Sequence, residues 1–377
     1  MDDGRTGGFI ETYVKWVEPW IDGPRSYHEW TAIMMLGTVS SDKIYIVQGD
    51  DKIHMNLYTL LIGDSSYMRK GSCIRQSVKL LNEVDPELIC PTFSSTESFF
   101  GSDLKGLMPL GEFDMFLEHA SKDYAKGFKS LITDLYEPLP SGAYKRKTRS
   151  ENVQVIGHTN ISIFGATALS WIRDRIRPND FMGGFLPRFC PVLETKRDRE
   201  IIRIRPKADE AMKENLVRFL RELHGELKGE IDTRGYINKY DEWGRNFELE
   251  IKDTPNEELL SPYYTRLEGV MHKLTVLNHI SNCFNSDSPY YYFPDVKAFS
   301  EAKTHVIALS HNVRELLQLL PLSKDRREQE RHRIKEYLRK NGITNRSEFL
   351  QNAVKCSGKE LTWHLERLRR SYSIRYL

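Results

Sequence analysis

Apolar residues in the first forty positions recur at the three- and four-residue spacing of a helix. Phe9, Tyr13 and Trp16 fall on one side of such a helix, and a second apolar stretch covers 30–39. The pair at 23–24, Gly followed by Pro, separates the two stretches because neither residue favours a continuing helix. The pattern therefore predicts two helices within residues 9–40.

Short apolar runs bounded by turn residues predict the strands that follow. The runs 44–47 and 57–62 are the first two, with the turn 49–51 between them. Further strands are expected at 88–93, 106–110, 153–156, 161–166 and 189–193, and helices at 128–136 and 171–176, with a capping box at 94–97. Strands that alternate with helices predict an α/β fold with a mostly parallel sheet flanked by helices.

The pattern changes to long amphipathic helices after about residue 205. These are expected at 207–228, 259–282 and 295–320. Three short helices and a closing strand then indicate a C-terminal winged helix. The predicted organisation is 1–50, a helical segment with the first strand; 51–205, a P-loop ATPase core; 206–320, a helical lid or subdomain; and 325–377, the winged-helix domain.

Composition is that of a soluble globular protein. The 377 residues are 40% hydrophobic and 29% charged, with a net charge of +2. No apolar run approaches the roughly 20 residues that cross a bilayer, and the first residues do not resemble a secretory signal. The five cysteines are far apart in sequence, so no local zinc or redox motif is present. We expect a cytoplasmic protein without membrane contact.

The segment 63–72, Gly-Asp-Ser-Ser-Tyr-Met-Arg-Lys-Gly-Ser, lies between a predicted strand and a predicted helix. This is the layout of a phosphate-binding loop, in which backbone amides cradle phosphates, Lys reaches the β and γ oxygens, and a hydroxyl binds Mg²⁺. An ordinary polar turn is the alternative. The residues expected to hold the nucleotide are Gly63, Ser65, Ser66, Arg69, Lys70, Gly71 and Ser72.

Four residues outside this loop are candidates for the chemistry. Nucleotide hydrolysis needs a carboxylate that either holds Mg²⁺ or polarises the attacking water. Glu112, after the strand at 106–110, is the first candidate, and Asp114 is the second and a candidate metal ligand. A carboxylate on a surface turn is the alternative for Glu112. Thr167, at the end of a strand, would contact the γ-phosphate. Arg188, within a Gly-Gly-Phe-Leu-Pro-Arg sequence, would neutralise the transferring phosphoryl group on a neighbouring subunit.

Basic residues gather in two segments that suggest DNA contacts. The segment 141–149 combines an aromatic with four cations, which contact phosphates while the aromatic stacks on a base. The third helix of the winged-helix candidate would present cations to a DNA groove. Solvated surfaces are the alternative for both. The expected DNA-binding residues are Tyr144, Lys145, Arg146, Lys147, Arg149, Lys359, Trp363 and Arg367.

Several of these segments occur together in a known order. They are 56–63, Arg69-Lys70, 111–113, 163–167, 184–189, and Arg266-Leu267 ahead of an apolar helix. In order and spacing, over about residues 9–320, the chain resembles a broad family of helicase-like ATPases of phages and mobile elements, often fused to or encoded beside primases. The variant phosphate loop of that family often carries Arg-Lys followed by Ser or Thr.

The resemblance implies a RecA-like or AAA+-like core that forms a ring, uses ATP and Mg²⁺, and moves on DNA. It implies that Lys70 binds phosphate and that Ser72 is a candidate Mg²⁺ ligand. Glu112 would then activate water, Thr167 would sense the γ-phosphate, and Arg188 would act in trans. Any primase partner must be a separate protein, because no primase domain is recognisable in this sequence.

The loop departs from the usual G-x-x-x-x-G-K-[ST] pattern. It is one residue longer, Arg69 replaces the second Gly, and Gly71 stands where the hydroxyl residue is expected. Asp64 brings a negative charge near the expected phosphate.

Three functions therefore remain open. The first is an ATP-dependent DNA motor, a replicative helicase of a phage or mobile element. The second is a non-motor DNA-binding replication initiator or loader with a degenerate nucleotide site, which Asp64 and Gly71 favour. The third is a small-molecule kinase, because Lys-Gly-Ser resembles the Lys-Gly-Thr of nucleotide kinases, although the basic segments argue against it.

Overall fold

The computed structural model describes most of the chain up to residue 319. The described residues are 7–64, 66–91, 100, 103–113, 115–116, 118, 128–147, 153–176, 180–181, 183–197, 199–252, 257–286 and 291–319. The chain divides into two units, Met1–Arg175 with Asn179–Val313, and Ile176–Pro178 with Arg314–Leu377. The first unit holds the sheet and the cavity described below.

A four-stranded parallel sheet forms the centre of the first unit. Its strands lie in the order β4 (Leu104–Leu110), β7 (Thr159–Thr167), β3 (Tyr58–Gly63) and β8 (Phe189–Glu194). Every residue of β3 and β7 is buried, as expected for parallel strands covered on both faces. The predicted α/β fold with a parallel sheet flanked by helices is confirmed.

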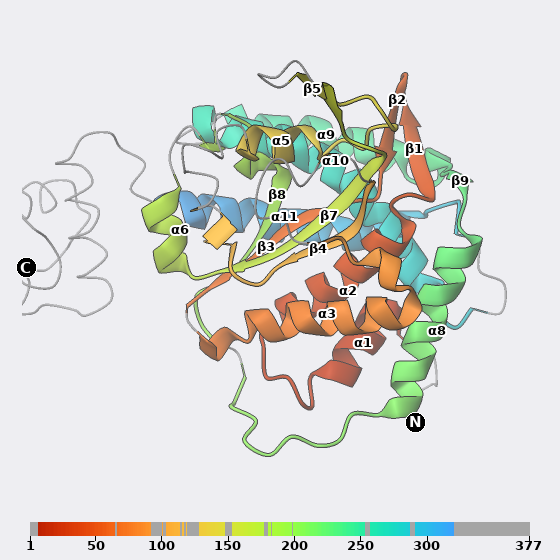
Figure 1. Cartoon of the computed structure of the whole chain (residues 1–377), viewed down its shortest axis with the longest axis vertical. Coiled ribbons are helices and arrows are strands. Elements are labelled where there is room, and N and C mark those ends of the chain that lie inside the picture. Colours follow the sequence, from red (N-terminus) through yellow and green to blue (C-terminus); the bar gives the residue numbers. More distant parts are fainter. Residues whose placement is uncertain are drawn as a thin grey trace, which may run out of the picture. The chain divides into compact units, whose positions relative to one another are not determined.

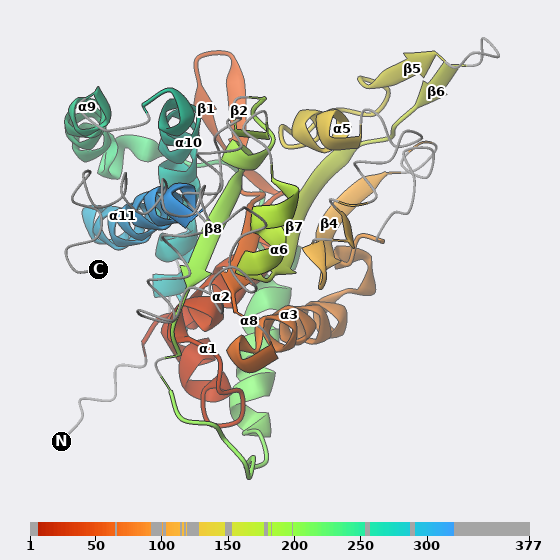
Figure 2. The ribbon, with the colours of Figure 1, turned by 90° about the vertical axis from the view of Figure 1, so that its left-hand side faces the viewer.

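Helices cover both faces of this sheet (Figures 1 and 2). On one face lie α2 (Arg25–Ser40) and α3 (Lys70–Val84), which pack against each other and against the strands. Helix α5 (Phe128–Asp134) lies on the other face, where its Ile132 carbonyl accepts a hydrogen bond of 3.2 Å from the Tyr58 hydroxyl. The helix expected at 128–136 is thus present, and it closes the core over β3.

The other helices match the predicted pattern except for one. Helix α9 (Ile237–Lys252) was not expected, because only Trp243 and Phe247 supply large buried side chains in its described part and Gly244 interrupts the apolar spacing. The remaining α-helices are α1 (Phe9–Val17), α6 (Leu169–Arg175), α8 (Glu210–Glu226), α10 (Glu257–Asn282) and α11 (Val296–Leu319). The 3₁₀ turns are η1 (Ser66–Met68), η2 (Pro86–Leu88), η5 (Leu186–Arg188) and η6 (Thr233–Gly235).

Two strand predictions were wrong in detail. The turn after β1 (Ile44–Gln48) leads into β2 (Asp51–His54), and not into β3. Strand β2 is polar and largely exposed, so no apolar run marks it. In the segment predicted at 88–93, Ile89 makes an isolated bridge to Leu107 directly after a Pro-initiated 3₁₀ turn.

Two small sheets complete the described strands. One has the order β2-β1-β9, in which β9 (Gly229–Glu230) pairs in parallel with β1. The other is the antiparallel hairpin of β5 (Lys145–Lys147) and β6 (Val153–Val155), which stands beside the start of β7 (Figure 2). The basic segment at 141–149 therefore includes one strand of a hairpin.

Several predictions fall on residues outside those described. The capping box at 94–97 and the whole winged-helix domain, 325–377, are among them. Within the described helices, none combines the length and the apolar character needed to cross a membrane.

Gly106 in β4 offers a test of the close approach between this strand and the backbone of Leu88. Its φ is +88°, and an added Cβ would come within 2.3 Å of the Leu88 carbonyl oxygen. We expect Gly106→Ala to lower the free energy of unfolding by about 2 kcal/mol or more, because the strain and the collision both involve backbone. Urea unfolding measures the change.

The matched control is Gly225→Ala in α8, where an added Cβ has nothing within 4 Å. Alanine is the better helix former, so this variant should be unchanged or more stable by up to about 1 kcal/mol. Equal stability of the two variants would contradict the close approach of β4 to Leu88.

Candidate functional site

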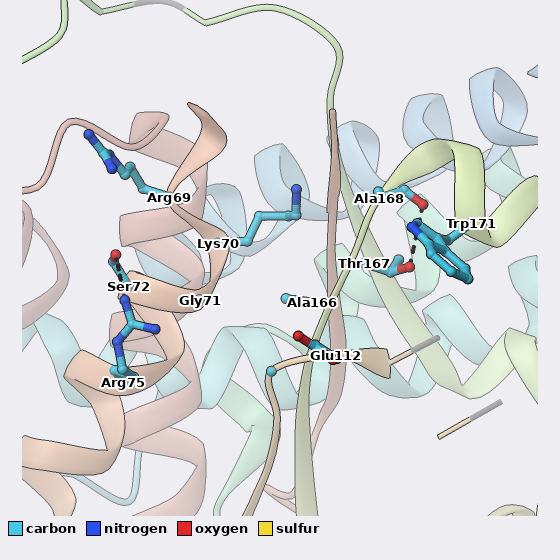
Figure 3. A pocket seen from close by; sticks show the side chains of 11 residues that line it. Arg69, Lys70, Gly71, Ser72, Arg75, Glu112, Ala166, Thr167, Ala168 and Trp171 are labelled. Atoms are coloured by element: carbon cyan, nitrogen blue, oxygen red, sulfur yellow. Dashed lines mark hydrogen bonds between the residues drawn. The ribbon is translucent and has the colours of Figure 1, made fainter. Parts of the chain in front are cut away.

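The parallel register brings several strand ends to one edge of the sheet. Ile62 of β3 pairs with Thr167 of β7, and Leu110 of β4 pairs with Gly165. The residues that follow these strands therefore meet at the carboxyl edge, where α/β proteins bind ligands. A cavity of about 510 Å³ lies there, within the range of small-molecule sites (Figure 3).

Lys70 places a cation at this cavity. It is the first residue of α3, its exposed fraction is 9%, and its Nζ donates a hydrogen bond of 2.7 Å to the Gly63 carbonyl. Burial lowers the pKa of the Lys70 ammonium, and the nearby Asp64 carboxylate partly opposes that shift. A desolvated ammonium gains more from an incoming anion than an exposed one does.

The start of α3 adds a second attraction for anions. Arg69, at the N-cap, makes no side-chain cap, and the first turn contains no acidic residue. No carboxylate within the first turn itself therefore offsets the first-turn amides and the positive end of the helix dipole. Lys70 and this helix end face the same cavity.

Arg69 takes an unusual conformation at this point. Its φ of 55° and ψ of 19° are left-handed, a region in which only Arg69 and Asn285 are found among the described non-glycine residues. Its backbone lies at the cavity, but its side chain turns away from Lys70 (Figure 3). The Arg69 Nε donates instead to the Asp22 carboxylate at 2.7 Å.

Glu112 and Thr167 line the cavity from two neighbouring strand ends. Glu112 follows β4 and is exposed, whereas Thr167 ends β7 with an exposed fraction of 3%. The Thr167 hydroxyl donates to the Ala168 carbonyl at 3.4 Å. Figure 3 shows Lys70, Glu112 and Thr167 arranged around one space. The structure thus brings together three residues that the sequence pattern singled out separately.

Ser72 also lines the cavity, but its hydroxyl is turned toward Arg75 (Figure 3). The Arg75 Nη2 donates to the Ser72 Oγ at 3.1 Å. Because Lys70 is already helical, Ser72 lies two helical positions further on, about 200° around the helix axis. Gly71 occupies the position next to Lys70 and has no side chain to contribute.

The other predicted nucleotide residues lie at or near the loop. Gly63 ends β3 where an added Cβ would come within 2.6 Å of the Tyr27 hydroxyl, so a side chain would not fit without a shift. Ser66 begins the 3₁₀ turn η1. Ser65 and Asp114 lie outside the described residues.

Arg188 is at the opposite edge of the sheet from the cavity. It immediately precedes β8, whose first residue pairs with Tyr58 and whose last, Glu194, pairs with Gly63. Five strand steps, about 17 Å, separate the two edges. The Arg188 Nη1 donates to the Gly184 carbonyl at 2.6 Å, and burial lowers the pKa of its guanidinium.

Among the predicted DNA-binding residues, four lie in the described region. Tyr144 immediately precedes β5, and the strand itself consists of Lys145, Arg146 and Lys147. The others, Arg149, Lys359, Trp363 and Arg367, lie outside the described residues.

Sequence reasoning missed Arg75 and Trp171, which also line the cavity. Trp171 follows the end of β7 by one helical turn and is 47% exposed, and this spacing from Thr167 is a signal that the sequence contains. Arg75 lies five residues after Lys70 on the same helix. Asp22, which holds the Arg69 side chain, is 47 residues away in sequence, and no local pattern connects the two.

Comparisons with known proteins do not identify this site. No protein-family model matches the chain, and no curated protein is similar enough in sequence to count as a match. Within the described residues there is also no group of three or more His, Cys, Asp or Glu side chains that could hold a metal ion together.

A buried charged lysine should lower the free energy of unfolding when no anion is bound beside it. Because the folded pKa of Lys70 lies below its unfolded value, its charged form is disfavoured in the folded protein. We expect Lys70→Met to raise the free energy of unfolding of the ligand-free protein at pH 7, by about 1 kcal/mol. Urea unfolding measures the gain.

The gain should shrink as pH rises through the folded pKa of Lys70 toward 10.5, because the wild-type lysine then loses its proton. The matched control is Lys79→Met, an exposed lysine on the same helix, which should change stability little. A lower stability of Lys70→Met than of wild type at pH 7 would contradict this account.

Proposed function

We propose that this protein is an ATP-dependent DNA motor, a helicase of the kind that replicates phages and mobile elements. The observation that carries the proposal is the convergence of Lys70, Glu112 and Thr167 on one cavity at the carboxyl edge of a parallel sheet. These are the cation, the acid and the polar group that nucleotide hydrolysis needs, and each comes from a different element.

In this proposal the cavity binds the triphosphate of ATP. The Lys70 ammonium leaves the Gly63 carbonyl and contacts the β and γ oxygens, while the first-turn amides of α3 contact the remaining phosphate oxygens. Glu112 orients and polarises the attacking water. Thr167 contacts the γ-phosphate from the neighbouring strand end.

The oxygen donors at the cavity fit a magnesium ion carried with the nucleotide. Mg²⁺ keeps several waters and takes the rest of its ligands from phosphates and one or two protein oxygens. The two protein oxygens proposed to bind the ion come from Ser72 and Asp114. The Ser72 hydroxyl lines the cavity and accepts a hydrogen bond from Arg75, and Asp114 follows two residues after Glu112. When bound, the ion would neutralise charge on the phosphate oxygens.

In a ring oligomer, Arg188 would act on the nucleotide bound by a neighbouring subunit. Its position at the opposite edge from its own cavity means that it is not available to the nucleotide of its own chain. In a ring, one subunit would offer this edge to the cavity of the next, and the guanidinium would stabilise the developing charge in trans. Primase activity would come from a separate protein.

Single-stranded DNA would contact the hairpin that contains β5. Lys145, Arg146 and Lys147 are three consecutive cations on that strand, preceded by Tyr144. Cations bind the phosphate backbone and an aromatic ring stacks on a base without regard to sequence. The winged helix proposed for 325–377 would supply a second DNA contact.

A DNA-binding initiator or loader with a weak nucleotide site is the second candidate. Gly71 lacks the hydroxyl expected next to Lys70, and the Ser72 Oγ already accepts a hydrogen bond from Arg75. Asp64 also brings a negative charge to the loop. Such a site would bind ATP and hydrolyse it slowly, and DNA binding would not be accompanied by unwinding.

The ATPase rate tests the motor proposal. We expect Mg²⁺-dependent ATP hydrolysis that single-stranded DNA stimulates, and a loss of about 100-fold or more in Lys70→Ala, because the phosphate charge is then unopposed. Phosphate release measures the rate. The matched control, Lys79→Ala on the exposed side of α3, should retain the wild-type rate.

Basal and stimulated rates that Lys70→Ala leaves unchanged would overturn the assignment of this cavity. ATP binding that depends on Lys70, together with tight duplex binding and no turnover, would select the initiator or loader.

The salt dependence of DNA binding tests the hairpin. Replacement of Lys145, Arg146 and Lys147 by Ala should weaken single-stranded DNA binding and reduce the slope of log K against log salt by about 2. The reason is that each phosphate contact releases counterions from the DNA, so a variant with fewer contacts releases fewer counterions when it binds. Fluorescence anisotropy over a salt series measures the slope.

The control removes the same number of cations from exposed positions on α8 and α9, Arg218, Lys239 and Arg245. This variant should bind with the wild-type slope. Equal slopes for the hairpin variant and wild type would exclude the hairpin as a phosphate contact.

A further inference from the structure

A buried carboxylate touches the phosphate loop from outside the cavity. Asp22 lies in the connection between α1 and α2 and has an exposed fraction of 0%. Its side chain accepts hydrogen bonds from Arg69 Nε at 2.7 Å, from the Ile202 amide at 3.2 Å, and from Arg197. A buried charge is stable only when such donors surround it, so these contacts fix three separate segments around Asp22.

The Arg69 contact coincides with the strained residue of the loop. The left-handed region is unfavourable for a non-glycine residue, which persists there only when its surroundings hold it in place. Glycine usually occupies this position of a phosphate loop because it adopts positive φ freely. In this chain Arg69 adopts a φ of 55°, and the ion pair with Asp22 anchors its side chain.

The same connection touches α3 at a second point. His28 Nε2 lies 3.1 Å from the Ile21 carbonyl oxygen, and its Nδ1 lies 3.8 Å from the Cys73 sulfur. A Cβ added at Gly23 would come within 3.5 Å of the Arg69 Cβ. The connection therefore packs against Arg69 on one side of Lys70, and His28 of α2 links it to Cys73 on the other side.

The contacts of Asp22 keep its carboxyl group charged at neutral pH. Burial by itself raises the pKa of this carboxyl, but hydrogen bonds from Arg69 and Arg197 and from the Ile202 amide lower it to about 2. Stability from these contacts is lost only as pH falls toward 2. Asp22 is thus a permanent anchor and not a pH switch.

We infer that Asp22 is a positioning residue for nucleotide binding, and that it acts through Arg69. By holding Arg69 in the left-handed turn, it sets the direction of Lys70 and of the first-turn amides of α3. The inference rests on the proposed role of the cavity as a nucleotide site. The Asp22 contacts to Arg197 and Ile202 anchor the segment after β8 and do not reach Lys70.

A double-mutant cycle on Asp22 and Arg69 tests this inference. Calorimetric titration with Mg·ATP is carried out on wild type, Asp22→Asn, Arg69→Gly and the double variant. We expect Asp22→Asn to weaken the binding of Mg·ATP by about tenfold or more, because Arg69 then loses the charged partner that anchors its side chain. Arg69→Gly should stay within about threefold of wild type, because glycine adopts the turn unaided. In that background Asp22→Asn should have almost no further effect.

Two further variants separate positioning from general stability. Arg69→Ala keeps the strained backbone without the ion pair, so it should lose affinity where Arg69→Gly does not, and it tests the idea even if Asp22→Asn fails to fold. Arg197→Met removes the other arginine partner of Asp22. It should lower the urea midpoint and leave the affinity for Mg·ATP unchanged.

Wild-type affinity in both Asp22→Asn and Arg69→Ala would overturn the positioning role while leaving the nucleotide site intact. The positioning role would also be overturned if Asp22→Asn lowered the affinity for Mg·ATP equally in the wild-type background and in the Arg69→Gly background. A wild-type protein that does not bind Mg·ATP, or binding that Lys70→Ala leaves unchanged, would overturn the proposed function itself.

Discussion

The parallel pairing of β3 with β7 and β8 is the constraint on which the rest of the first unit depends. Parallel strands place all their carboxyl ends at one edge, so a shift in register would move Thr167 and Glu194 relative to Gly63. Strands β3 and β7 are buried on both faces, so their side chains are packed against neighbours along their whole length. The cavity is a consequence of that geometry more than of any single residue.

The fold was largely predictable because the buried strands are continuous apolar runs. The runs in β3, β7 and β8 are long enough to recognise without tertiary information, and the helices between them carry regular spacing. Polar elements were not predictable in the same way. Strand β2 has no apolar face to mark it, and only its first residue, Asp51, falls within the predicted turn at 49–51.

The candidate site was predictable in part, for a related reason. Lys70, Glu112 and Thr167 each follow a recognisable strand, and strand ends in a parallel sheet meet at a known edge. Asp22 was not predictable, because its contact with Arg69 depends on how the connection between α1 and α2 packs against the start of α3. The hydrogen bond between Ser72 and Arg75 was also hidden, since the helix begins at Lys70 and not after Ser72.

The hydrogen bond between Lys70 and the Gly63 carbonyl has a kinetic consequence. The ammonium already has an acceptor within its own loop, so an arriving anion exchanges one oxygen for another and does not meet a disordered side chain. Under the proposed function, little conformational search would then be left for the lysine when a ligand arrives. When such a ligand left, the Gly63 carbonyl would again accept a hydrogen bond from the ammonium, so the desolvated charge would not remain without a partner.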